Sequence, residues 1–98
     1  MYRHISVFTL ENKEEIDTLI KQLHEVEKCP LILKGEVGVN VTPLPEEGLK
    51  GPDFGDVVQM IDFASKEDLE AYPTSKEHLK LFKEGPKMKK VSAIDYEI

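Results

Sequence analysis

The sequence predicts an α+β protein with the ferredoxin-like order β-α-β-β-α-β, in which one four-stranded antiparallel sheet carries two helical regions. Four segments have the alternation or the β-branched content of strands. Two further segments have apolar residues at helical spacing, one between the first two strands and one between the last two. Because 98 residues are too few for two separate cores, we expect residues 1–98 to form a single domain.

The first strand is predicted over residues 2–10, where successive side chains point to opposite faces of the sheet. Ile5 and Val7 share one face. The other face carries His4, Ser6, Phe8 and Leu10. Apolar groups on both faces indicate that each face needs a covering layer.

The first helix is predicted over residues 13–28. Asn12 ends the strand and can cap the helix through its side-chain oxygen, with Glu15 three residues later in a capping-box-like position. Apolar residues then recur at helical spacing, at Ile16, Leu19, Ile20, Leu23 and Val26. Pro30 follows just past the predicted end, as is common where helices stop.

Residues 31–42 and 56–63 are predicted to be the second and third strands because both are rich in β-branched residues. Gly35 and Gly38 indicate a bulge or a bend in the second strand. Between the two strands, residues 43–55 contain three prolines and three glycines. This loop is either a functional flap or a mobile hairpin tip.

Pro73 divides the second helical region. Ser65 is predicted to cap its first segment, which closes at Pro73 because the proline ring disfavours the α conformation at Tyr72. Thr74 and Glu77 then repeat the spacing of a capping box, so we expect them to begin a second segment.

The last strand is predicted over residues 90–98, and the complete sheet has two apolar faces. The third strand carries Val57 and Ile61 on one face and Val58 and Met60 on the other. Two helices can cover only one face, so we expect a second copy of the chain to cover the other, as a homodimer. We expect His4, which shares a face with Phe8, to lie on the side that the helices leave uncovered.

Composition excludes several classes of function. A formal net charge of −6 argues against nucleic-acid binding, which depends on basic groups that release counterions from phosphates. Cys29 is the only cysteine, so no disulfide can form within the chain. The first ten residues lack the pattern of a signal peptide, and no apolar run is long enough to cross a membrane. We therefore expect a cytoplasmic protein without membrane or nucleic-acid partners.

No motif indicates a metal or a cofactor. The sequence has no H-E-x-x-H, no C-x-x-C and no glycine-rich phosphate loop. A Ser-His-Asp triad could be composed from Ser6, His4 and Asp62, but these residue types are common and nothing in their spacing supports it, so we reject it. His24 falls in the polar arc of the first helix, which is typical of a surface residue.

Tyr72 and His78 offer the most specific chemistry. On a continuous helix, six residues would place their side chains about 120° apart around the axis. The break at Pro73 removes this restriction, so both can point into one cavity; the alternative is a plain turn between two helices. A neutral imidazole can abstract a proton near neutral pH, and a phenol can donate a hydrogen bond to a developing oxyanion.

Five motifs along nearly the whole chain resemble those of the stress-responsive dimeric α/β-barrel family, often written Dabb. Their order and spacing are similar to the family's. The motifs are "HISVFTL", "GEVGVN", "GDVVQMIDF", "DLEAYPTSKEH" and "IDYEI". The resemblance implies a homodimer in which two sheets enclose a barrel with a largely apolar cavity.

One plant branch of this family pairs a tyrosine with a histidine at the spacing of Tyr72 and His78, and catalyses the aldol-type cyclisation of a polyketide thioester. The resemblance implies that His78 is the general base and that Tyr72 holds the carbonyl oxygen. We expect the pocket to be lined by His4, Ser6, Phe8 and Val57. The chain departs from the family pattern where Ser75 and Lys76 replace a His-Pro pair. Some relatives hold magnesium, but no ligand cluster here predicts a metal.

Three functions are consistent with these observations. The first is a homodimer that binds a small, mainly apolar molecule in the barrel cavity. The second is a cofactor-independent enzyme, of the aldol-type cyclase or monooxygenase kind, with His78 as base and Tyr72 as oxyanion donor. The third is an interaction or stress protein with a filled barrel and no ligand.

Overall fold

The computed structural model describes residues 1–42 and 55–98, so most of the predicted 43–55 loop lies outside the described residues. The strands are β1 (Tyr2–Leu10), β2 (Ile32–Val39), β3 (Val57–Phe63) and β4 (Met88–Glu97). The helices are α1 (Ile16–Val26), α2 (Lys66–Ala71) and α3 (Lys76–Glu84), with 3₁₀ turns at Lys13–Glu15 and Tyr72–Thr74. This order confirms the predicted ferredoxin-like fold.

The four strands form one antiparallel sheet in the order β2-β3-β1-β4, so β1 and β3 are central and β4 is an edge strand. The register places His4 of β1 opposite Ile61 of β3 and opposite Asp95 of β4. Two residues along β1, Ser6 lies opposite Ala93. The ends of the chain lie together, because the amide of Ile98 donates to the carbonyl of Met1 at 2.9 Å.

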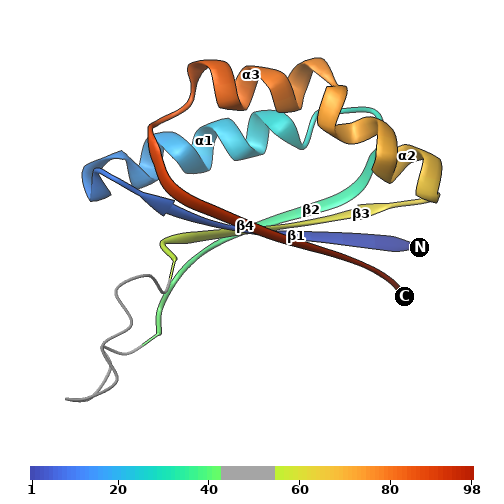
Figure 1. The fold of residues 1–98 in the computed structure, drawn as a ribbon, viewed down its shortest axis with the longest axis horizontal. Coiled ribbons are helices and arrows are strands. Elements are labelled where there is room, and N and C mark those ends of the chain that lie inside the picture. Colours follow the sequence, from blue (N-terminus) through green and yellow to red (C-terminus); the bar gives the residue numbers. More distant parts are fainter. Residues whose placement is uncertain (43–54) are drawn as a thin grey trace.

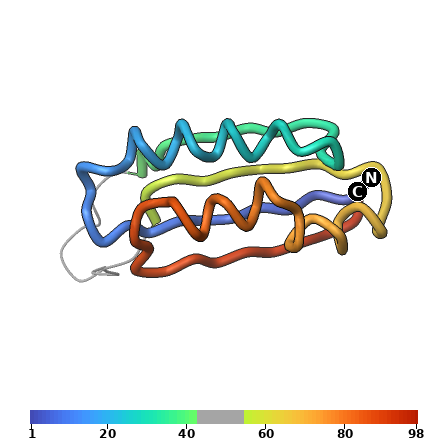
Figure 2. The backbone as a smooth tube through the Cα atoms, turned by 90° about the horizontal axis from the view of Figure 1, so that it is seen from above, coloured from blue at the N-terminus to red at the C-terminus, as the bar shows by residue number. Residues whose placement is uncertain are grey.

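All the helices lie on one face of the sheet, and the opposite face is bare in a single chain (Figure 1). Figure 2 looks onto the helix layer and shows α1 on the side of β2 and α3 on the side of β4. The core fills the space between the two layers. Its most completely buried side chains are Leu10, Leu19, Leu23, Val26, Val57, Ile61 and Phe63.

The prediction that His4 faces away from the helices is wrong. Phe8 and Leu10, on the same face of β1, belong to the core cluster together with Leu19 and Leu23 of α1. His4 is therefore on the helix side of the sheet, and its ring lies near Tyr72. Alternation shows which residues share a face, but it does not show which face the helices cover.

Of the predicted helix caps, only that of α2 is found unchanged, since Asn12 caps the 3₁₀ turn before α1 and α1 itself has no side-chain cap. Ser65 accepts a hydrogen bond from the amide of Asp68 at 3.1 Å, as predicted. At α3 the cap is Ser75, whose hydroxyl oxygen accepts from the amide of His78 at 3.2 Å. The predicted cap, Thr74, lies in the 3₁₀ turn instead, where its hydroxyl donates to the carbonyl of Ala71 at 3.1 Å.

The bare face of the sheet is apolar around one ion pair. Val58, Ile94 and Tyr96 are 37%, 64% and 41% exposed there in a single chain. Arg3 donates two hydrogen bonds to the buried carboxylate of Asp62, at 2.8 and 3.0 Å, and this contact holds the pKa of Asp62 below its usual range. No helix in the described part of the chain is long and apolar enough to cross a membrane.

Candidate functional site

A cavity of about 140 Å³ lies between the sheet and α3, near the β4 edge. This volume is that of about five molecules of liquid water. The cavity is lined by His4, Ser6, Phe8, Gln59, Tyr72, His78, Leu81, Phe82, Val91 and Ala93. It combines apolar walls with a hydroxyl, a phenol and two imidazoles. Its volume is below the roughly 300 Å³ at which ligand pockets usually begin, so it has room only for a very small molecule.

The break at Pro73 brings Tyr72 and His78 together. Tyr72 lies in the 3₁₀ turn before α3 and is only 3% exposed. Its ring is 5.3 Å from that of Phe63 in the core and 4.8 Å from the imidazole of His78, centroid to centroid. The two candidate catalytic side chains therefore meet edge to face at one cavity.

His78 is held in one tautomer by its neighbours. Its Nδ1 lies 3.0 Å from the carbonyl oxygen of Pro73, and a carbonyl can only accept, so Nδ1 carries the proton. Nε2 then has a lone pair, and no described residue hydrogen-bonds to it. Burial lowers the pKa of His78, with a smaller contribution from the nearby His4, so the neutral ring predominates at pH 7. This is the state that a general base requires.

Tyr72 presents a protonated phenol. Burial raises the pKa of its hydroxyl above the ordinary value, so the group stays neutral and can donate. Among the described residues, none hydrogen-bonds to this hydroxyl. A buried tyrosine usually has a hydrogen-bond partner. Because Tyr72 has none among the described residues, its hydroxyl can donate to a ligand.

His4 is the centre of a second polar arrangement. Its Nδ1 contacts the carboxylate of Asp95 on β4, and its Nε2 lies 2.7 Å from the hydroxyl oxygen of Ser6. The His4 and Tyr72 ring centroids are 5.8 Å apart. The rejected triad with Asp62 does not form, because that carboxylate pairs with Arg3 on the other face of the sheet.

The model of the stress responsive A/B barrel domain, Dabb, matches residues 2–98. The chain belongs to the Dabb family. No curated protein sequence matches it.

Solved structures share the fold of this Dabb chain. A Dabb family protein with a ferredoxin-like fold from Mesorhizobium loti aligns with a TM-score of 0.76 and 19% identity, over 99% of this chain and 95% of its own. A dimeric ferredoxin-like protein of unknown function from Thermobifida fusca aligns with a TM-score of 0.74 and 18% identity, over 99% of this chain and 90% of its own. A hydroxynitrile lyase from Passiflora edulis aligns with a TM-score of 0.77 and 22% identity, over 99% of this chain and 92% of its own.

Most of the site residues predicted from sequence lie together. His4, Ser6 and Phe8 line the cavity with Tyr72 and His78. Val57 does not line it; its side chain is 1% exposed and belongs to the hydrophobic core.

Sequence reasoning missed six residues that the fold adds to the site, namely Gln59, Leu81, Phe82, Val91, Ala93 and Asp95. Asp95 joins it only through the pairing of β4 with β1, which no local pattern predicts. Phe82 and Val91 form part of the wall, from α3 and β4. A signal for Phe82 was present, since it follows His78 by four residues and such residues are neighbours on a helix.

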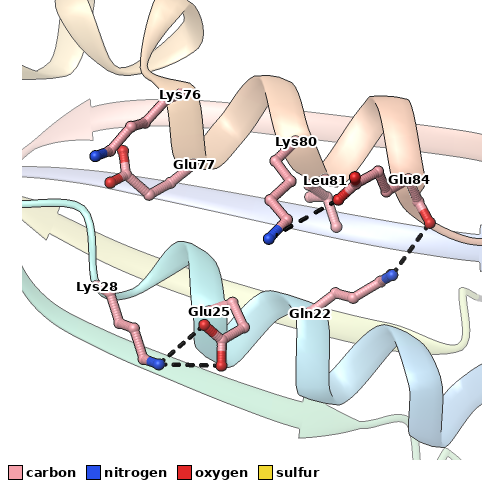
Figure 3. A pocket seen from close by; sticks show the side chains of 8 residues that line it. All are labelled: Gln22, Glu25, Lys28, Lys76, Glu77, Lys80, Leu81 and Glu84. Carbon is pink, nitrogen blue, oxygen red and sulfur yellow. Dashed lines mark hydrogen bonds and ion pairs between the residues drawn. The ribbon is translucent and has the colours of Figure 1, made fainter.

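A larger hollow lies elsewhere on the described part of the Dabb chain. A groove of about 500 Å³ runs between α1 and α3, and charged side chains from both helices line it (Figure 3). Four of its charged side chains form ion pairs: Lys28 with Glu25 at 2.9 Å, and Lys80 with Glu84 at 3.9 Å. It contains no imidazole, phenol or other aromatic group. We therefore place the functional site in the smaller cavity, where the reactive groups converge.

No group of three or more His, Cys, Asp or Glu side chains that could hold a metal ion occurs within residues 1–42 and 55–98.

Proposed function

We propose that two copies of the chain form a homodimer, and that each copy binds a small, mainly apolar molecule between its sheet and α3. One observation carries the proposal: the Tyr72 hydroxyl and the His78 Nε2, which have no hydrogen-bond partner among the described residues, belong to side chains that line a largely apolar cavity.

The two polar groups define the ligand. Tyr72 donates to an acceptor such as a carbonyl oxygen, and the neutral His78 accepts from a hydroxyl or removes an acidic C–H proton. Phe8, Leu81 and Val91 provide apolar surface for a short carbon chain. The ligand class is therefore a small ketone, aldehyde or hydroxy compound.

The bare sheet face supports the homodimer. Monomeric proteins rarely leave a contiguous apolar patch exposed, and a second sheet packed on Val58, Ile94 and Tyr96 would remove it from water. The Thermobifida fusca neighbour, described as dimeric, has the same fold. The cavity lies on the opposite side of the sheet, so each copy keeps its own site in this arrangement.

A second candidate function is cofactor-independent catalysis, and the fixed tautomer of His78 favours it. Nε2 removes a proton from the carbon next to a carbonyl, while the Tyr72 hydroxyl stabilises the enolate oxygen that forms. The name of the Passiflora edulis neighbour shows that this fold also occurs in an enzyme, although a shared fold does not assign a reaction.

A single small ketone can test both functions. Butanone binding is followed by NMR chemical shifts, and exchange of its α-protons is followed in D₂O. We expect His78→Gln to lower the exchange rate by about 10²-fold or more while changing the affinity much less. His24→Gln, on the exposed face of α1, is the matched control.

Binding without exchange would support the ligand-binding function and reject catalysis. Shifts confined to the α1–α3 groove, with none at Tyr72 or His78, would contradict both functions.

A further inference from the structure

The side chains of Asp95, His4 and Ser6 form one continuous hydrogen-bonded chain that the Tyr72–His78 chemistry does not use. We propose that this chain is a nucleophilic site in which Ser6 accepts a short acyl group from an activated ester, giving the protein a hydrolytic activity separate from the proposed function. His4 is the general base and Asp95 orients it.

The proton positions follow from the partners of the imidazole. The Asp95 carboxylate can only accept, so Nδ1 of His4 carries a proton. In the neutral ring Nε2 is then an acceptor, and the Ser6 hydroxyl, 2.7 Å away, is its donor. A carboxylate, an imidazole and a serine in this order are the arrangement that activates serine nucleophiles on unrelated folds.

The sheet itself fixes this geometry. His4 and Ser6 are two residues apart on β1, so both side chains project from the helix side. Asp95 lies directly opposite His4 on β4 and therefore points to the same side. Because regular strands position all three residues, little reorganisation is needed before reaction.

The cavity gives a substrate access to the serine. Ser6, His4 and Tyr72 all line it, although Ser6 is only 5% exposed. Ala93, opposite Ser6 on β4, and the neighbouring Val91 supply small apolar walls. A volume of about 140 Å³ suits a short acyl chain such as acetyl and excludes a long one.

The Tyr72 hydroxyl supplies the oxyanion donor. It borders the same cavity, it stays protonated, and its ring centroid lies 5.8 Å from that of His4. A single donor of this kind contributes about 10²–10³-fold to the rate in serine hydrolases.

The reaction balances without a further reagent except water. As the bond from Ser6 Oγ to the ester carbonyl carbon forms, the hydroxyl proton moves to His4 Nε2. The bond to the leaving oxygen then breaks, and that oxygen takes the proton from His4. A water molecule, deprotonated by His4, attacks the acyl-serine, which releases the carboxylic acid and returns the proton to Ser6.

The same contacts could serve only to hold the edge strand β4 against β1, and the experiment separates these roles. The protein is mixed with p-nitrophenyl acetate, p-nitrophenolate release is followed, and the acetylated peptide is located by mass spectrometry. We expect a burst of about one equivalent per chain and an acetyl group on Ser6.

Ser6→Ala should abolish both the burst and the Ser6 label, and His4→Gln should slow acylation by about 10²-fold or more. Ser92→Ala is the matched control, because Ser92 lies on β4 opposite Val7, on the other face of the sheet. Ser6→Cys guards against a misfolded alanine variant, since it keeps a nucleophile and should form a thioester at the same position.

Acetylation confined to lysines or to the chain amino terminus, with no burst, would overturn the proposal. So would a Ser6→Ala variant that keeps the burst of the unmodified chain. In either case the Asp95–His4–Ser6 contacts are structural.

Discussion

The Nδ1 atom of His78 lies 3.0 Å from the carbonyl oxygen of Pro73, the residue that separates α2 from α3. In an unbroken helix this oxygen would accept from the backbone amide four residues later. Because the helix is broken here, the carbonyl oxygen of Pro73 accepts from the imidazole of His78 instead. The same proline that interrupts the helix thus helps to orient the candidate base.

The cap of α3 should matter to the site as well as to stability. Ser75→Ala removes the hydrogen bond to the amide of His78 and should lower the free energy of unfolding by about 1 kcal/mol. It should also weaken butanone binding, because the first turn of α3 carries the imidazole. Ser65→Ala removes the equivalent cap of α2 and should cost similar stability without affecting binding. Chemical denaturation and NMR titration of both variants test this, and equal losses of affinity would contradict it.

Stability should depend on pH through His78. Its pKa is lowered in the folded state, so the unfolded chain binds more protons as pH falls through the ordinary value of 6.5. The contribution of His78 to the free energy of unfolding is therefore fully present above pH 6.5. It is lost as the pH falls through the lower pKa of the folded state. Between pH 5 and 8, urea denaturation of His78→Gln should show a smaller rise in stability with pH than the parent chain.

The control for this pH effect is His24→Gln, whose imidazole is exposed and 3.4 Å from Glu27. This variant should leave the dependence of the unfolding free energy on pH near that of the parent chain. An unchanged slope in His78→Gln would show that the imidazole is not buried as the structure describes.

Tyr72→Phe should separate function from stability. The hydroxyl has no hydrogen-bond partner among the described residues, so its removal should change the unfolding free energy little, while the ring keeps its contacts with Phe63 and His78. Affinity for butanone should fall about fivefold, which corresponds to about 1 kcal/mol for one hydrogen bond. A large loss of stability with unchanged affinity would indicate a structural role instead.

The bare sheet face should control oligomeric state. Ile94→Lys places a charge on the apolar face and should shift the sedimentation mass from twice 11.2 kDa toward 11.2 kDa. Leu79→Lys is a matched control, because Leu79 is similarly exposed, at 55%, but lies on α3. A parent chain that sediments as a monomer at micromolar concentration would contradict the homodimer.

Local patterns in the sequence predicted the elements well. Ser65 caps the helix that it was expected to cap, and apolar spacing marked the buried stripe of α1. Asn12 caps the 3₁₀ turn at Lys13–Glu15 rather than α1 itself. The start of α3 was misplaced by one residue, because Thr74 and Ser75 are both able to cap. Only the 3₁₀ turn, in which the Thr74 hydroxyl donates to Ala71, decided between them.

The sequence by itself determined the order of strands and helices and the break at Pro73, because propensity, capping and periodicity act over a few residues. It left open whether Tyr72 and His78 meet at one cavity or only flank a turn. Only the tertiary structure decided that the His4 face lies beneath the helices and that Asp95, 91 residues away, reaches His4. The physical reason is that alternation fixes which side chains share a face, whereas helix packing chooses the face and strand register chooses the partner.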